Sequence, residues 1–96
     1  MLIWTKLLRM EIRASAHFER RYKKLPQVIK EKAKKQEKFF VANPFDPRVA
    51  THKLGGKDHG KWSYSIDYDY RIKFIFVDDN RGVLYLDVGT HDEIYR

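Results

Sequence analysis

Four side chains in the second half of the sequence are of types that transfer protons, bind phosphate or stack on rings. They are His52, Arg71, His91 and Tyr95. Histidine suits proton transfer because its unperturbed pKa is about 6.5. Arginine is always charged and donates hydrogen bonds in a planar fork that matches phosphate oxygens, and aromatic rings stack on nucleobases. On spacing alone, an arginine within a strand or a histidine at a strand end is more often a surface residue.

Alternating apolar and polar residues predict the strands that carry these side chains. In the segment 62–67, Trp, Tyr and Ile alternate with Ser and Asp, which predicts a strand buried on one face only. The segment 70–77 alternates in the same way and puts Arg71 on the outward face. A turn at 78–82 and a last strand over 83–88 follow. In that last strand we expect one face to hold Leu84, Leu86 and Val88.

Two helices are predicted before these strands. Ser15 is a candidate N-cap, because its hydroxyl can accept a hydrogen bond from a free backbone N–H. Apolar residues then recur at helical spacing as far as Leu25, and Pro26 ends the helix because it pushes the preceding residue out of the α region. A second helical pattern continues to about Val41. The tight Leu-Pro corner predicts an antiparallel helix hairpin.

The charge of the chain favours an anionic partner. The net charge is +7 and the pI is about 9.7, which suits nucleic acid and acidic protein equally. Residues 17–38 hold nine Lys and Arg against three Glu, so the predicted helices supply most of the field. The absence of cysteine suits a reducing cytosol. No convincing export signal and no apolar run of membrane-spanning length is present, so we expect a cytoplasmic protein without membrane contact.

Three short segments resemble the RelE/ParE superfamily of bacterial toxins. They are His52-Lys-Leu, the Tyr70-Arg71 step and Gly89-Thr-His91. The first and last look most like the YafQ type of mRNA endonuclease. The resemblance implies an α+β, RelE-like fold with the order β-α-α-β-β-β, in which an antiparallel sheet packs on a two-helix hairpin. It also implies that 11–14 is the first strand, so that residues 1–9 are a possible extension of a single domain, 1–96.

The resemblance implies a catalytic role for each of the four side chains. In YafQ-like toxins the Gly-Thr-His segment carries a catalytic histidine, so His91 is expected to act as general acid or base. His52 is expected to be a second proton-transfer group, and Arg71 to contact the scissile phosphate. Tyr95 corresponds to a terminal aromatic that stacks on a base or transfers a proton, and packing of the C-terminus is an equally good reading. RNA cleavage by transphosphorylation needs no metal and no other cofactor.

The same resemblance implies partners. The expected substrate is mRNA on the ribosome, and the expected protein partner is an acidic antitoxin encoded next to this chain. Candidate RNA-binding residues are the lysines near the strands and two on the second helix. They are Lys53, Lys61, Lys73, Lys34 and Lys35.

Three alternatives stay open at this point. One is a ParE-like protein that binds DNA gyrase without catalysis, although the histidines at 52 and 91 argue against a pure binder. Another is an inactive toxin-fold protein that binds only antitoxin or RNA. Many relatives place an arginine where this chain has Ser63, Ser65 or Asp67, and an acid at 67 would repel phosphate if it faced the site. Metal catalysis is the least favoured, because no close pair has the His-x-x-x-His or Glu-x-x-His spacing that would place two ligands on one helix face.

Overall fold

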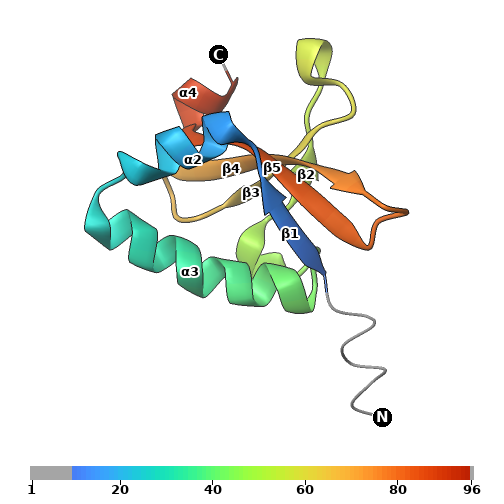
Figure 1. Cartoon of the computed structure of the whole chain (residues 1–96), viewed down its shortest axis with the longest axis horizontal. Coiled ribbons are helices and arrows are strands. Elements are labelled where there is room, and N and C mark those ends of the chain that lie inside the picture. The colour runs from blue at the N-terminus through green and yellow to red at the C-terminus, as the bar shows by residue number, and fades with distance from the viewer. Residues whose placement is uncertain (1–9, 96) are drawn as a thin grey trace.

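The computed structural model describes residues 10–95, which build one five-stranded sheet in the order β1-β5-β4-β3-β2. The strands are β1 (Glu11–Ala14), β2 (His52–Lys53), β3 (Trp62–Ser65), β4 (Tyr70–Val77) and β5 (Gly82–Thr90). The helices are α2 (Ala16–Lys23), α3 (Gln27–Ala42) and α4 (His91–Tyr95), with the 3-10 turns η1 (Pro47–Val49) and η2 (Gly56–Asp58). The long α3 crosses one side of the sheet, and α4 lies on the other side (Figure 1). The expected extension 1–9 lies outside the described residues.

The predicted α+β fold and its element order are confirmed. Strands β3, β4 and β5 form the expected antiparallel meander. Strand β1 runs parallel to β5, however, so the sheet as a whole is mixed. Parallel neighbours need a long connection between them, and here both helices of the hairpin and three strands intervene. The sequence patterns missed β2 and α4, because two and five residues are too few to show a period.

The predicted helix hairpin is also confirmed. The Ser15 hydroxyl accepts a hydrogen bond from the backbone N–H of Phe18 at 3.0 Å, so it caps α2. Pro26 stands at the N-cap of α3, where a residue without an N–H leaves no helical hydrogen bond unmade. Within residues 10–95, no helix is both long and apolar enough to cross a lipid bilayer.

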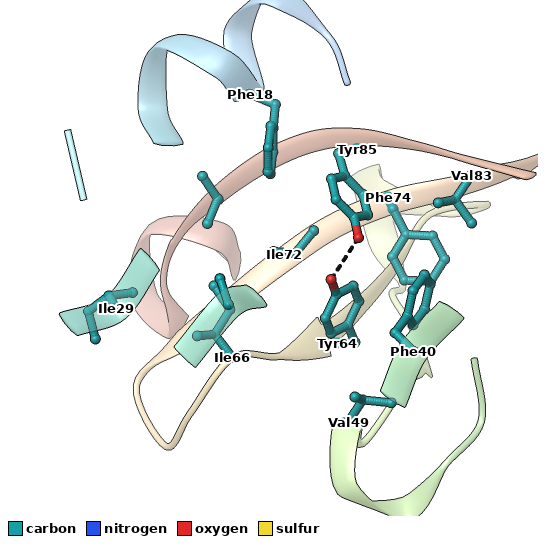
Figure 2. Packing of buried hydrophobic residues seen from close by; sticks show 12 residues of the cluster. Phe18, Ile29, Phe40, Val49, Tyr64, Ile66, Ile72, Phe74, Val83 and Tyr85 are labelled. Atoms are coloured by element: carbon teal, nitrogen blue, oxygen red, sulfur yellow. Dashed lines mark hydrogen bonds between the residues drawn. The ribbon is translucent and has the colours of Figure 1, made fainter. Parts of the chain in front are cut away.

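The core lies between the sheet and the two helices of the hairpin (Figure 2). Phe40 of α3 is fully buried, stacked on Tyr64 at 4.2 Å between ring centroids and edge-on to Phe74 at 5.0 Å. The hydroxyls of Tyr64 and Tyr85 lie 2.8 Å apart, and Tyr85 donates to Glu37 at 2.7 Å. Burial raises the pKa of both tyrosines well above the usual range. Both rings therefore stay neutral, and their polar atoms are satisfied inside the core.

One expectation for the last strand is wrong, because β5 contains a bulge. Phe74 pairs with Tyr85 and the preceding Lys73 pairs with Asp87, so Leu86 is an extra residue with no partner opposite. A bulge of this kind shifts the alternation by one residue. The buried hydrophobic side chains of β5 are consequently Val83, Tyr85 and Val88, so Val88 does not share a face with Leu84 and Leu86.

Candidate active site

The face of the sheet turned away from α3, here called the outer face, carries a row of polar side chains. His52 of β2 pairs with Ser63 of β3, and Ser63 pairs with Lys73 of β4. Residues paired directly across neighbouring strands place their side chains on the same face. Helix α4 packs against β4 and β5 on this side, and its Ile94 is only 1% exposed. The outer face thus combines a polar row with a docked helix.

The Gly89-Thr90 step has a structural role in starting α4. The Thr90 hydroxyl accepts from the Glu93 backbone N–H at 3.3 Å, and Glu93 accepts from the Thr90 N–H at 2.7 Å, which is a capping box. The hydrogen bond from the Thr90 N–H, helped by nearby Arg21, lowers the pKa of Glu93. A Cβ at position 89 would lie 2.5 Å from Arg21 Nη2 and 2.7 Å from Glu93 Oε1. An alanine there would require the Arg21 guanidinium and the Glu93 carboxylate to shift, and these two groups pair α2 with α4 and close the capping box.

Three residues from three elements form a hydrogen-bonded trio on the outer face. Tyr95 OH of α4 lies 2.9 Å from His52 Nε2 and 2.6 Å from the Ser63 hydroxyl. The second ring nitrogen of His52, Nδ1, lies 3.1 Å from the carbonyl oxygen of Ala50. Ser63 is completely buried, so the prediction that its strand is buried on one face only is wrong. The reason is that α4 covers this part of the second face.

His91 begins α4 and lies beside the same tyrosine. Its ring is edge-on to Tyr95 with 4.4 Å between centroids, and its side chain is 57% exposed. Its backbone N–H donates to the Asp69 carbonyl at 2.6 Å, which ties α4 to the turn between β3 and β4. His91 Nδ1 lies 3.6 Å from an Asp92 carboxylate oxygen and forms an ion pair with it whenever the imidazole is protonated. His52 therefore contacts the hydroxyl of Tyr95, and His91 packs against the ring of the same tyrosine.

One nitrogen of the Arg71 guanidinium is hydrogen-bonded to the backbone. Its Nη1 donates to the carbonyls of Asp67, Tyr68 and Tyr70 at 2.6, 3.0 and 3.0 Å. The guanidinium thereby closes the turn between β3 and β4. Its Nε and Nη2 have no hydrogen-bond partner among residues 10–95, so they remain available to an incoming group.

Solved structures resemble this chain along most of its length, although no family model and no curated protein sequence matches it. The YoeB/ParE toxin from Agrobacterium tumefaciens superposes with a TM-score of 0.71 at 16% identity, covering 85% of this chain and 99% of that one. YafQ from E. coli gives 0.68 at 16% identity, with 92% and 100% covered. The RelBE2 toxin–antitoxin complex from Mycobacterium tuberculosis gives 0.68 at 24% identity, with 86% and 99% covered. The chain has the RelE/ParE toxin fold.

On this RelE/ParE fold, the outer-face lysines are held by an acid that the sequence patterns did not single out. Asp58 of η2 is 8% exposed and lies 3.1 Å from Lys73 Nζ and 3.3 Å from Lys61 Nζ. Burial alone would raise the pKa of Asp58, but the hydrogen bonds from Lys73 and then Lys61 outweigh it and hold that pKa below the usual value. These two candidate RNA-binding lysines therefore carry a joint charge of about +1 with their partner.

The other three candidate RNA-binding lysines of this chain lie away from the trio. Lys53 Nζ lies 5.5 Å above the ring of Trp62, on the face opposite that of His52. Lys34 and Lys35 are exposed on α3, across the sheet from α4. The fold thus gathers His52, His91 and Tyr95 at one place and leaves these three lysines on other surfaces.

Asp67, which would oppose phosphate binding from the outer face, is turned towards α3. Its carboxylate accepts from the backbone N–H groups of Asp69 and Tyr70 at 2.9 and 2.8 Å and lies 3.3 Å from Lys32 Nζ. Burial on its own would raise the pKa of Asp67, but these backbone hydrogen bonds, with Lys32, lower it. The negative charge of Asp67 is thereby balanced by Lys32 and by the backbone N–H groups of the turn. The carboxylate does not face the trio.

Two residues of the site were missed by reasoning from the sequence. Ser63 carries no signal, because a serine in a strand usually faces solvent. Asp58 carries a weak signal, because Lys61 follows it three residues later, a spacing at which the two side chains can pair. The capping box Thr90-x-x-Glu93 was readable, and it predicts a helix start immediately after β5.

Proposed function

We propose that this protein is the toxin of a type II toxin–antitoxin pair and cleaves mRNA on the ribosome as a metal-independent endoribonuclease. The RelE/ParE toxin fold supports the broader part of the proposal. The single observation that carries the finer part is the 2.9 Å approach of Tyr95 OH to His52 Nε2, with His91 edge-on to the same ring. Transphosphorylation requires one group that accepts the 2′-hydroxyl proton and another that donates a proton to the 5′-oxygen.

The proposed roles follow the bonds that form and break. The 2′-oxygen attacks phosphorus while its proton passes to the His52–Tyr95 pair. The P–O5′ bond breaks while protonated His91 gives its proton to the departing 5′-oxygen. The products are a 2′,3′-cyclic phosphate and a 5′-hydroxyl, so no proton or water is left over. Arg71 stabilises the crowded phosphorane through its Nε and Nη2, because a guanidinium donates in a planar fork that matches phosphate oxygens.

The proposal includes an acidic antitoxin. The net charge of +7 favours an acidic partner, and RelBE2 and DinJ–YafQ are toxin–antitoxin complexes of this fold. We expect such a protein to be encoded in the neighbouring reading frame, to bind this chain and to abolish its toxicity. A neighbouring product that is basic, or that leaves toxicity unchanged, contradicts this part.

The deciding experiment measures mRNA cleavage on translating ribosomes. We expect His91→Gln and Tyr95→Phe each to lower single-turnover cleavage by about 100-fold or more, as the loss of one acid–base group typically does. His59→Gln is the matched control: His59 is an exposed histidine that follows η2 and lies outside the trio. Equal cleavage by all four proteins would remove the site assignment.

A supercoiling assay with purified DNA gyrase tests the rival from a different class. Under the proposal, gyrase is unaffected at protein concentrations that cleave mRNA completely. Gyrase inhibition with intact ribosomal mRNA would overturn the proposal in favour of a ParE-like inhibitor. Normal growth of a sensitive host that expresses the protein alone would show a toxin fold without toxin activity.

A further inference from the structure

The backbone at Ala50 determines which nitrogen of His52 carries the proton. A carbonyl oxygen only accepts hydrogen bonds, so Nδ1, which lies 3.1 Å from it, must be the protonated nitrogen. Ala50 has φ +50°, a left-handed conformation that is costly for a residue with a Cβ. The bend directs the chain from η1 into β2, where Ala50 lies two residues before the histidine. In the neutral imidazole, Nε2 is therefore a bare acceptor.

The direction of the other two hydrogen bonds follows from that assignment. A bare Nε2 can only accept, so Tyr95 OH must donate to it across 2.9 Å. The single phenolic proton is then used, so the 2.6 Å contact with Ser63 requires the serine hydroxyl to donate to the tyrosine oxygen. Ser63 is 0% exposed, and within residues 10–95 its hydroxyl has no other hydrogen-bond partner. One arrangement satisfies every group: Ser63 to Tyr95, Tyr95 to His52, and His52 to Ala50.

We propose that Ser63 is a positioning residue: by donating to the Tyr95 oxygen it reinforces Tyr95 as the hydrogen-bond donor to His52 and makes the trio a one-way proton path. The inference rests on the proposed function, in which this pair takes the 2′-hydroxyl proton. As the 2′-oxygen bonds to phosphorus, its proton moves to the Tyr95 oxygen while the phenolic proton moves to His52 Nε2. The tyrosine ends as it began, and the imidazole becomes an imidazolium. Ser63 donates throughout to the oxygen that carries the passing negative charge.

The path runs only while His52 is neutral. A protonated Nε2 must donate, so the Tyr95 hydroxyl would turn towards Ser63 and could no longer pass a proton to the histidine. Among residues 10–95, the charged groups near the trio include the ion pair of Lys73 with Asp58, next to Ser63, the neighbouring Lys61, and His91 with its partner Asp92 on α4. Within that part of the chain, the titratable group that contacts Nε2 itself is Tyr95.

Two measurements test the proposal, and the first does not depend on cleavage. Nitrogen-15 NMR of the wild-type imidazole should show His52 with a protonated Nδ1 and a bare, hydrogen-bonded Nε2. Ser63→Ala weakens the donation from Tyr95, so the Nε2 signal should move towards that of a free nitrogen, and Tyr95→Phe should move it further. A protonated Nε2 in the neutral imidazole of the wild type overturns the proposal. An Nε2 signal that is unchanged by Ser63→Ala also overturns it.

The second measurement is a double-mutant cycle in single-turnover cleavage. We expect Ser63→Ala to lower cleavage by about tenfold or more in the wild-type background, as the loss of a hydrogen bond to a developing charge does. In the Tyr95→Phe background the same change should cost nothing, because its only route of action is gone. An equal loss in both backgrounds overturns the proposal, since Ser63 would then act through the fold. Absence of cleavage by the wild type would refute the proposed function, and the NMR signals would still decide the hydrogen-bond direction.

Discussion

At the scale of single residues, Arg71 joins a structural and a proposed catalytic role in one guanidinium. Its Nη1 contacts three carbonyls of the β3–β4 turn. We expect Arg71→Ala to lower the free energy of unfolding by about 1–3 kcal/mol through those lost bonds. We also expect cleavage to fall about 100-fold or more, because a charge donor for the phosphorane is gone. Urea unfolding and single-turnover cleavage of the same preparation measure the two losses.

The two roles of Arg71 separate when cleavage is measured far below the unfolding transition. There the folded fraction of Arg71→Ala stays near one, so a purely structural arginine predicts nearly full activity. Full activity under those conditions would contradict the phosphorane role. Arg71→Lys is the informative companion, because it keeps the charge and loses the planar fork.

Asp58 makes a pH prediction at the same scale. Its pKa is lowered in the folded state, because the hydrogen bonds from Lys73 and Lys61 outweigh burial. As the pH falls, protons therefore bind the unfolded chain first. The stabilisation is present above the ordinary carboxyl pKa of about 3.9 and is lost as the pH drops through the lower folded value. Asp58→Asn should be less stable than wild type at pH 7 by about 1–3 kcal/mol, and the difference should shrink below about pH 4.

Denaturant unfolding between pH 2 and pH 7 measures this difference. Asp79→Asn is the control, because Asp79 lies in the exposed β4–β5 turn. A stability difference for Asp58→Asn that stays constant down to pH 2 would show that the carboxylate charge is not its origin.

At the scale of elements, α4 carries two of the proposed catalytic side chains, and its docking decides their position. A methyl group at position 89 would meet Arg21 Nη2 and Glu93 Oε1. We expect Gly89→Ala to push the Glu93 carboxylate out of the capping box, which loosens the start of α4, lengthens the contact of Tyr95 with His52 and lowers cleavage by about tenfold or more. The sheet and α3 do not depend on this contact, so the far-ultraviolet circular dichroism should hardly change.

Gly55→Ala is the matched control for this prediction. A Cβ at Gly55 meets nothing within 4 Å, and the backbone there is extended. Its cleavage and stability should equal those of the wild type. If Gly89→Ala also cleaves normally, the docking of α4 does not set the geometry of the trio.

At the scale of the whole molecule, most of the charge lies on the helix hairpin while the proposed chemistry lies on the far face of the sheet. Phosphate contacts release counterions, so the logarithm of affinity falls with the logarithm of salt in proportion to their number. Replacing Lys34 and Lys35 by Gln should weaken ribosome binding and flatten its salt dependence, with a slope change of about 0.7–0.9 for each lost contact. Cleavage at saturating protein should stay nearly intact.

A salt titration of binding beside saturated single-turnover cleavage makes this measurement. The control removes the same charge from other exposed sites through Lys57→Gln and Arg81→Gln, in η2 and the β4–β5 turn. It should change the salt slope less than the α3 pair does. Saturated cleavage that is abolished by the α3 pair, and spared by Arg71→Ala, would place the chemistry on the helices.

The sequence by itself determined the features that depend on local chain chemistry. Ser15 caps α2 and Pro26 separates the helices, because their effects act on backbone groups a few residues away. The alternation of residues in β3 and β4 marks the strands, since a pleated strand places successive side chains on opposite faces. The residue types and order in three short segments were enough to predict the fold. The similarity to solved toxin structures confirms that prediction.

Only the tertiary structure decided which of these side chains meet. Tyr95 is 43 residues from His52 and 32 from Ser63, so their contact depends on strand register and on how α4 docks. The bulge at Leu86 is a property of pairing between β4 and β5, and it reverses the faces that alternation predicts. Arg71 and Asp67 read as free outward charges in the sequence, yet backbone groups of one turn engage both. Partners that lie far apart in the chain leave no trace in local composition or period, because those patterns record only residues a few positions apart.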